Sequence, residues 1–435
     1  MRIGIVPVAS RHVGGIYQYS ATMLRTLRQY THEGCDDEFV VFSEGNLPEA
    51  SSSAPNWTVR SQSLAEPASL GQRTLEFLRD TFGEGRSRNA IRSILKPFRK
   101  ERPEPDLNQL RRQQVISERF RHEGVDLMLY PSPLPVAFET EIPYVMAVHD
   151  LQHRLQPEFP EVSADGEWER REYLFRNGTR YATLLLADSE VGKEDILNFY
   201  EPYGVTPDQV KVLPFLPACY LQQEISPEER KRVRAMHGLP ERYLFYPAQF
   251  WPHKNHKRIV EALALLRDRG TRVDVVFCGS HTGDILKRTH REVMRLASSL
   301  GIEDNIHYRG YVGDEDMSGL YAEAAALVMP TFFGPTNIPV LEAWSLGCPV
   351  ITSGIRGIRE QVQEAAILVD PRSVESIAEG ISKIWMDEHL AKDLVRRGQD
   401  RLATYTPDDY RKRLIDILEE GKRRRTDHHA RVGSL

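Results

Sequence analysis

Short apolar runs alternate with amphipathic stretches along most of the chain. An apolar run of roughly four to eight residues is typical of a strand in a parallel sheet, and an amphipathic stretch is typical of a helix that covers the sheet. The runs predict strands at 2–8, 38–42, 127–130, 144–148, 183–187 and 211–213 in the first half, and at 243–247, 273–278, 306–309, 326–329, 349–352 and 366–369 in the second. Helices are expected between them, among others at 16–30, 225–237, 256–269 and 284–300.

The alternation restarts at mid-chain, which predicts an α/β protein with two Rossmann-like, doubly wound domains facing a cleft. A length of 435 residues fits two domains better than one core. We expect an N-terminal domain at 1–220 and a C-terminal domain at 221–400. Residues 401–435 are expected to form a C-terminal helix followed by a disordered tail from Arg423.

One segment, about 66–121, lacks the strand pattern and is rich in basic residues. Apolar residues fall among them at helical spacing, as Ile91, Ile94, Leu95 and Phe98. A basic amphipathic helix can lie on an anionic membrane. The alternative is a solvated helical insertion, and the sequence leaves both interpretations open.

Composition narrows the classes of function. A net charge of −5 gives no electrostatic argument for nucleic acid, and the four cysteines lie far apart, without the spacing of a zinc site or a disulfide framework. The first residues contain no signal-peptide pattern, and no apolar run approaches the roughly 20 residues that span a bilayer. We therefore expect a cytoplasmic protein, with peripheral contact at the inner face of the membrane as an open possibility.

The segment 329–351 is the most informative stretch for chemistry. A buried strand ends at Pro330, a loop containing Gly334 and Pro335 follows, and a helix begins near Ile338 and ends before Gly347. Such a helix start lies at the carboxyl edge of a parallel sheet, where free N–H groups and the helix dipole favour a diphosphate.

Side chains at this helix start extend the prediction. Thr336 or Asn337 is a suitable N-cap, and Glu342 can reach back to a vicinal diol such as a ribose. Glu342 could instead only complement the helix dipole. In the segment 246–256, which follows the first strand of the second half, Lys254 is a candidate point charge for phosphate.

Together these segments resemble the retaining glycosyltransferases of family 4 (glycosyl transferases group 1), which have the GT-B architecture. The stretch from Leu341 to Ile351 fits the family's Leu-Glu-Ala-x-x-x-Gly-x-Pro-Val-Ile pattern. The family usually carries two glutamates here, separated by seven residues. The second corresponds to Glu342, but the first is replaced by Gly334, within a Phe-Gly-Pro-Thr-Asn loop that a subset of the family shares.

The resemblance implies roles for individual residues. It implies ribose binding by Glu342 and a pyrophosphate contact by Lys254, while a second cation of the family is replaced by Gln249. His149, followed by Asp150 at the end of a strand, fits a family histidine near the reacting sugar; His153 is a weaker candidate. Further contacts are implied for the donor loop from Gly334 to Ile338, for Tyr311 and Val312 at the base, and for Gly14 and Gly15 as a loop near the diphosphate or acceptor.

The implied reaction moves a sugar from a nucleoside diphosphate sugar, GDP-mannose or a UDP-sugar, to an acceptor hydroxyl with retained configuration. A glycan or a lipid-linked acceptor in polysaccharide or glycolipid assembly is expected, with no metal, no other cofactor and no nucleic acid. A sugar-nucleotide epimerase and a glycan phosphorylase are rivals on the same scaffold, although their distinctive residues are not visible. The loss of acid at Gly334 and of cation at Gln249 leaves a different class open. That class is a non-catalytic sugar-nucleotide-binding or scaffolding protein.

Overall fold

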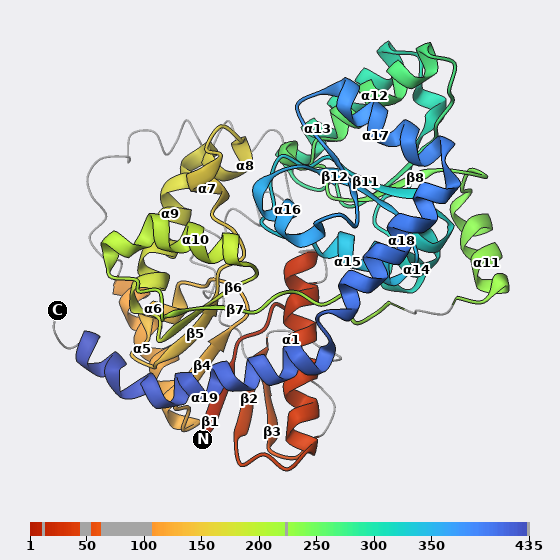
Figure 1. Cartoon of the computed structure of the whole chain (residues 1–435). Coiled ribbons are helices and arrows are strands. Elements are labelled where there is room, and N and C mark those ends of the chain that lie inside the picture. Colours follow the sequence, from red (N-terminus) through yellow and green to blue (C-terminus); the bar gives the residue numbers. More distant parts are fainter. Residues whose placement is uncertain (11–13, 44–53, 62–106, 222–224, 433–435) are drawn as a thin grey trace, which may run out of the picture.

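The computed structural model describes residues 1–10, 14–43, 54–61, 107–221 and 225–432, which form two lobes (Figure 1). The N-lobe is built on a parallel sheet in the order β3-β2-β1-β4-β5-β6-β7. Its strands are β1 (Arg2–Ile5), β2 (Glu38–Ser43), β3 (Trp57–Ser61), β4 (Leu127–Tyr130), β5 (Tyr144–Ala147), β6 (Leu184–Ala187) and β7 (Val210–Val212). Its helical segments are α1 (Gly15–His32), α5 (Leu107–His122), α6 (Val136–Glu139), α7 (Gln152–Leu155), α8 (Pro160–Ser163), η3 (Ala164–Gly166), α9 (Glu167–Tyr181), α10 (Glu190–Tyr200) and η4 (Glu201–Tyr203).

The C-lobe is built on a second parallel sheet, in the order β10-β9-β8-β11-β12-β13. Its strands are β8 (Leu244–Pro247), β9 (Val275–Cys278), β10 (Ile306–Tyr308), β11 (Ala326–Met329), β12 (Val350–Ser353) and β13 (Ile367–Val369). Its helical segments are α11 (Pro227–His237), η5 (Pro252–Lys254), α12 (His256–Asp268), α13 (Asp284–Ser299), η6 (Glu303–Asn305), α14 (Asp314–Glu323), α15 (Ile338–Ser345), α16 (Arg356–Val362), α17 (Val374–Met386) and α18 (Glu388–Ala403).

Both sheets are buried on two faces, which explains why their strands are continuous apolar runs rather than alternating ones. In β4, Leu127 and Leu129 belong to the apolar cluster on one face of the sheet, and Met128 and Tyr130 to the cluster on the other. The two-domain, doubly wound α/β prediction is confirmed, and all twelve predicted strands are present within one to three residues of their expected ends.

The edge strand β3 (Trp57–Ser61) was not predicted. Among the described strands it pairs with β2 alone, with Phe39 opposite Trp57 and Val41 opposite Val59. Its sequence mixes apolar and polar residues because an edge strand is half exposed, so the continuous-run criterion does not detect it. The helices α9 and α10 were also not specified in advance.

The last helix, α19 (Pro407–Val432), leaves the C-lobe and crosses back beneath the N-lobe (Figure 1). Tyr410, Leu414, Ile417 and Leu418 are buried in the N-lobe apolar cluster beside β1, β4 and β5. The prediction of a disordered tail from Arg423 is wrong as far as Val432, because the helix continues there. Ion pairs that anchor it to the N-lobe include Lys422 with Asp37 at 2.7 Å.

The two lobes also contact each other directly through α10 and α16. The Glu360 carboxylate accepts hydrogen bonds from the first N–H groups of α10, those of Glu190 and Val191, each at 3.1 Å. Arg356 forms ion pairs with Glu194 at 2.7 Å and Asp195 at 2.9 Å. An acid at the positive end of a helix and an arginine beside two carboxylates both stabilise the contact, so these pairs fix how the lobes face each other.

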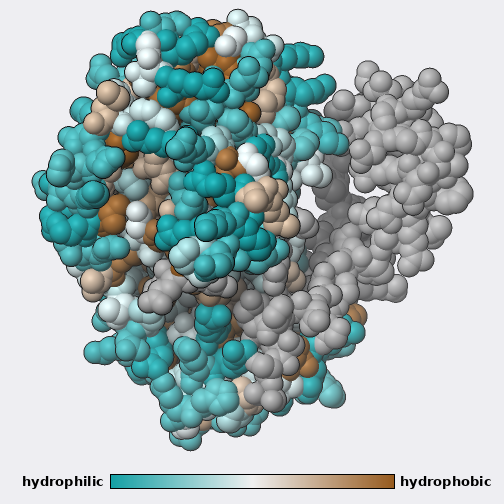
Figure 2. Space-filling model, turned by 90° about the vertical axis from the view of Figure 1, so that its right-hand side faces the viewer, coloured by the Kyte–Doolittle hydropathy of each residue, from teal (hydrophilic) through white to brown (hydrophobic). Residues whose placement is uncertain are grey.

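The surface seen in Figure 2 is mostly hydrophilic, with scattered apolar residues. Among the helices of the described residues, none combines the length and apolar character needed to cross a bilayer. The basic segment that suggested a membrane-binding helix lies, up to residue 106, outside the described residues, so this hypothesis stays a prediction.

Helix α18 supports α15 through a close contact that depends on glycine. A Cβ added to Gly398 would lie 2.2 Å from Cδ1 of Trp344. The Trp344 indole is buried and donates to the Ala365 carbonyl at 3.2 Å, so the ring cannot move away freely. We expect Gly398→Ala to lower the free energy of unfolding by about 1–3 kcal/mol through overpacking, although alanine is the better helix former. Urea unfolding checks this, with the exposed Gln399→Ala as a control expected to change little; equal stability of both variants would contradict the overpacking.

Candidate active site

A pocket lies between the lobes, where the start of α1 faces the start of α15 (Figure 1). The N-lobe and the interlobe segment line it with Gly14, Gly15, Gln18 and Tyr220; the C-lobe lines it with Pro247, Ala248, Gln249, Cys278, Gly279, Ser280, Tyr311, Val312, Asp314, Met317, Ile338, Pro339 and Glu342. The C-lobe residues come from the carboxyl ends of β8, β9 and β10 and from α14 and α15. This is the sheet edge at which open α/β folds bind ligands.

Glu342 lies at this pocket with its carboxylate held by two tyrosines. The Tyr321 hydroxyl donates to Oε2 at 2.6 Å, and the Tyr220 hydroxyl donates to Oε1 at 3.0 Å. Burial raises the pKa of Glu342 to about 7, and the two hydroxyl donors oppose this rise. The carboxylate is therefore fixed in place, and each oxygen can still accept a hydrogen bond from a ligand hydroxyl.

The loop before α15 is fixed from both lobes. Asn337 occupies the N-cap position with φ −138°, as expected, but its side chain makes no cap bond. Its N–H donates to Oε1 of Gln361 at 3.0 Å, so this N–H is not free for an anion as the sequence suggested. Thr336 Oγ1 donates to the carboxylate of Asp188 in the N-lobe. Pro335 packs against α16, where a Cβ on Gly357 would lie 2.2 Å from the Pro335 carbonyl oxygen.

Lys254 ends the short 3-10 turn η5, beside the same sheet edge. Asn255, in the left-handed conformation with φ 63°, closes the turn and donates to the carbonyls of Pro330 at 2.7 Å and Pro371 at 2.8 Å. This buried amide ties Lys254 to the end of β11. In the described part of the chain, no carboxylate lies within the 4.0 Å of an ion pair to Lys254.

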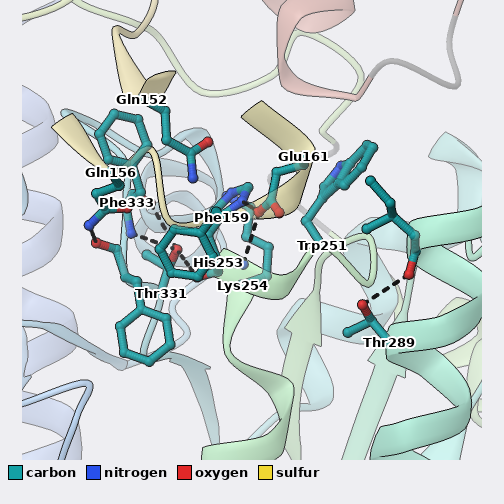
Figure 3. A network of polar contacts seen from close by, with 12 residues as sticks. Gln152, Gln156, Phe159, Glu161, Trp251, His253, Lys254, Thr289, Thr331 and Phe333 are labelled. Carbon is teal, nitrogen blue, oxygen red and sulfur yellow. Dashed lines mark hydrogen bonds and ion pairs between the residues drawn. The ribbon is translucent and has the colours of Figure 1, made fainter. Parts of the chain in front are cut away.

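Lys254 is partly buried, and its amine is influenced by two acids of the N-lobe, Asp150 and Glu161. Burial lowers its pKa to about 8, and the charges of Asp150 and Glu161 oppose the shift. Figure 3 shows Lys254 and His253 on one turn, with Glu161 of α8 facing His253. Glu161 accepts from Nδ1 of His253 at 2.7 Å. The hydrogen bond between His253 and Glu161 thus holds the turn that carries Lys254 against the N-lobe.

His149 and Asp150 follow β5, at the carboxyl edge of the N-lobe sheet. Because Pro131 offers only a carbonyl, Nε2 of His149 must donate to it, at 2.7 Å, which leaves Nδ1 as the acceptor of the neutral ring. Burial lowers the pKa of His149. The Asp150 carboxylate accepts from the Gln152 N–H at 3.0 Å. Neither His149 nor Asp150 is among the residues that line the pocket.

Of the remaining predicted residues, some line the pocket and one is buried in the core of the N-lobe. Gly14, with φ 69°, and Gly15 form the wall at the start of α1. Tyr311 is half exposed, and Val312 is buried beside it. His153 is fully buried and contacts Glu172 at 3.3 Å, so it belongs to a structural cluster rather than to the pocket.

Several residues at the site escaped the sequence analysis. Tyr220 and Tyr321, which hold Glu342, are separated from it by 122 and 21 residues, so no local pattern connects them. Asp188, which accepts from Thr336, lies 148 residues from it, so no local pattern connects these two either. Asp314 is the first residue of α14. Many helices begin with an acidic residue, so the sequence does not distinguish Asp314 as a ligand contact.

Comparisons with known proteins agree with this geometry. Residues 228–401 match the family Glycosyl transferases group 1. The O-antigen chain mannosyltransferase B of Escherichia coli is 26% identical over 308 residues, which cover 66% of this chain and 76% of that protein. The D-inositol 3-phosphate glycosyltransferase of Salinispora arenicola is 26% identical over 257 residues, 55% of each chain. Thus the matched region spans three quarters of one relative and about half of the other.

Among solved structures, Anabaena Alr3699/HepE in complex with UDP and glucose superposes with a TM-score of 0.65 at 16% identity, covering 96% of this chain and 99% of that one. At this identity the likeness concerns the fold, which is the GT-B arrangement. The family match and these relatives are likenesses to glycosyltransferases, which favours an enzyme over the non-catalytic alternative.

Proposed function

We propose that this enzyme, whose C-lobe carries a glycosyl transferases group 1 domain, moves a hexose from a nucleoside diphosphate sugar to an acceptor hydroxyl with retention of configuration. The observation that carries the proposal is the interlobe pocket, which is lined by the fixed, buried carboxylate of Glu342. Lys254, which has no ion-pair partner in the described residues, lies on the η5 turn outside the residues that line this pocket. The two groups suit different parts of a nucleoside diphosphate: ribose hydroxyls donate to a carboxylate, and an ammonium group attracts the diphosphate.

In the reaction, the bond between the anomeric carbon and the diphosphate oxygen breaks, and a bond to the acceptor oxygen forms on the same face. The acceptor proton passes to the leaving diphosphate, whose developing charge Lys254 stabilises. Asp188 and Glu161 hold the donor loop and the Lys254 turn against the N-lobe, so in this arrangement residues of both lobes are held beside the proposed site.

GDP-mannose and UDP-sugars are both candidate donors, and Asp314 favours guanine. Asp314 lines the pocket together with Tyr311 and Val312, the proposed base contacts. The Watson–Crick edge of guanine offers two adjacent N–H donors to a carboxylate, whereas uracil offers one N–H between two carbonyls. A mannosyltransferase among the relatives agrees with a GDP-sugar, and HepE with UDP supports the other donor class. We propose a glycan or lipid-linked acceptor in polysaccharide or glycolipid assembly.

A thermal-shift panel of GDP, UDP, ADP and TDP tests the site and the base together. We expect GDP to raise the melting temperature of the wild type most, because a ligand that binds only the folded state stabilises it by mass action. We expect Asp314→Asn to weaken GDP binding roughly tenfold and to leave UDP binding unchanged, which corresponds to one lost hydrogen bond to a charged group. A stronger response to UDP in both proteins would overturn the guanine assignment. A wild type that responds to none of the four would overturn the proposed function.

A further inference from the structure

The turn η5, which carries Lys254, is held by both lobes. Residues of the C-lobe bind its carbonyl groups: the Tyr246 hydroxyl donates to the Lys254 carbonyl at 2.9 Å, and the Phe332 N–H donates to the His253 carbonyl at 2.8 Å. The N-lobe binds its N–H side. The backbone N–H of His253 donates to Oε1 of Glu161 at 3.1 Å, and Nδ1 of the ring donates to the same oxygen at 2.7 Å. The position of Lys254 therefore depends in part on an acid of the opposite lobe.

Glu161 is buried in the contact that it makes. Its side chain is 5% exposed, and Oε2 has no hydrogen-bond partner among the described residues. Burial raises the pKa of this carboxyl, but the hydrogen bond and charge of His253 outweigh burial and hold the pKa of Glu161 below its usual value. A charged carboxylate is thus kept between the lobes at neutral pH, which is costly unless a positive group nearby offsets it.

Lys254 is the positive group near Glu161. Burial lowers the pKa of Lys254, and the charges of Asp150 and Glu161 oppose this effect. Burial also lowers the pKa values of the two histidines in the adjoining sequence, His253 and His256, so both are neutral at neutral pH. The charged side chains that act on the Lys254 amine are therefore the two acids of the N-lobe.

The two acids differ in what else balances their charge. Asp150 lies 3.5 Å from the Arg171 guanidinium, so an arginine already offsets it. Glu161 has no lysine or arginine within ion-pair distance in the described part of the chain, and its partner His253 is neutral. The charge of Glu161 is thus the less compensated of the two and acts more fully on Lys254.

We infer that Glu161 is a positioning residue for Lys254: from the N-lobe it fixes the turn through His253, and it supplies negative charge near the Lys254 ammonium group. The inference rests on the proposed function, in which Lys254 attracts the diphosphate. It goes beyond that function because Glu161 acts through its neighbours and touches no substrate itself. The lobe opposite the donor-binding residues thus prepares the group that attracts the diphosphate.

Isothermal titration with GDP between pH 7 and pH 9, or with UDP if the thermal-shift panel selects uracil, tests this without an acceptor. In the wild type we expect affinity to fall as Lys254 loses its proton with rising pH. Glu161→Gln keeps an oxygen that accepts from His253 and removes the charge. We therefore expect its affinity at pH 7 to stay within about threefold of wild type, and the fall to begin roughly half a pH unit lower. Glu161→Ala also removes the acceptor, so its affinity at pH 7 should be weaker by about fivefold or more.

Glu360→Ala is the matched control. Glu360 is also an interlobe carboxylate that accepts from two N–H groups, but these belong to α10 and not to the Lys254 turn. We expect this variant to keep the wild-type affinity within about twofold and the wild-type pH of the fall, as for a site without shared partners. Lys254→Met should abolish the fall. Thermal unfolding without ligand shows whether each variant is folded.

Three results would overturn the inference and leave the nucleotide site in place. A fall at the wild-type pH in Glu161→Gln would show that its charge does not act on Lys254. Equal losses of affinity in Glu161→Ala and Glu360→Ala would show a general effect of lobe contact. A fall that is absent in the wild type, or that persists in Lys254→Met, would show that Lys254 does not govern it. If the wild type binds neither GDP nor UDP, the proposed function fails, and this inference fails with it.

Discussion

Lys254→Met is expected to lower kcat/KM for the nucleotide sugar by roughly 10²–10³, the usual cost of removing one preorganised group that stabilises charge in the transition state. Methionine is an unbranched side chain one atom shorter than lysine, and it removes the charge together with the N–H donors. Lys254 has no carboxylate partner in the described residues within ion-pair distance, so the loss reflects substrate rather than a broken salt bridge. Release of the nucleoside diphosphate from the donor sugar measures the effect.

The pKa of Lys254 predicts how kcat/KM falls at alkaline pH. Burial lowers the pKa of Lys254 to about 8, so the free enzyme loses this charge as the pH rises through 8, and kcat/KM, which reports the free enzyme, falls there. Lys254→Arg should retain activity to higher pH, at a lower maximum because the guanidinium has a different shape.

Lys257→Met is the matched control for Lys254. Lys257 lies three residues further along and pairs with Glu292 at 2.6 Å on the exposed side of α12. We expect its loss to leave kcat/KM within twofold of wild type. Equal effects at both positions would show that general charge, and not the position of Lys254, supports the reaction.

Glu342→Gln is expected to weaken nucleoside diphosphate binding by roughly 10- to 100-fold, because hydrogen bonds from the ribose to a charged acceptor are replaced by bonds to an amide. The variant keeps the side-chain size in the space between Tyr220 and Tyr321. Titration with the nucleotide selected by the thermal-shift panel measures the loss. If the nucleotide affinity of Glu342→Gln were unchanged, Glu342 would not bind the ribose and would only complement the helix dipole.

The pKa of Glu342 predicts how nucleotide affinity falls at acid pH. Burial raises it to about 7, so the carboxylate is charged above pH 7 and becomes protonated below it. Nucleotide affinity should therefore fall as the pH drops through 7, and this dependence should vanish in Glu342→Gln. Burial raises the pKa of Asp188 to about 7 as well. An acid limb that persists in Glu342→Gln but disappears in Asp188→Asn would assign the limb to the interlobe contact instead.

The sequence by itself determined the two sheets and the place of the donor loop. Strands buried on both faces must be continuous apolar runs, so β4 and β11 can be recognised without any knowledge of their neighbours. The change from buried strand to glycine-containing loop to helix places residues 334–342 at a sheet edge, because the order of these elements in a parallel sheet leaves no other position.

Only the tertiary structure decided how the side chains at this edge are held. Tyr220 meets Glu342, Thr336 meets Asp188, and Glu161 meets His253 across 122, 148 and 92 residues. Periodicity reports which face of an element is buried, but it carries no information on which distant side chain will lie opposite. For the same reason the sequence could show that an acid is missing at Gly334, whereas only the packing of the loop shows that the amide of Asn337 occupies its space.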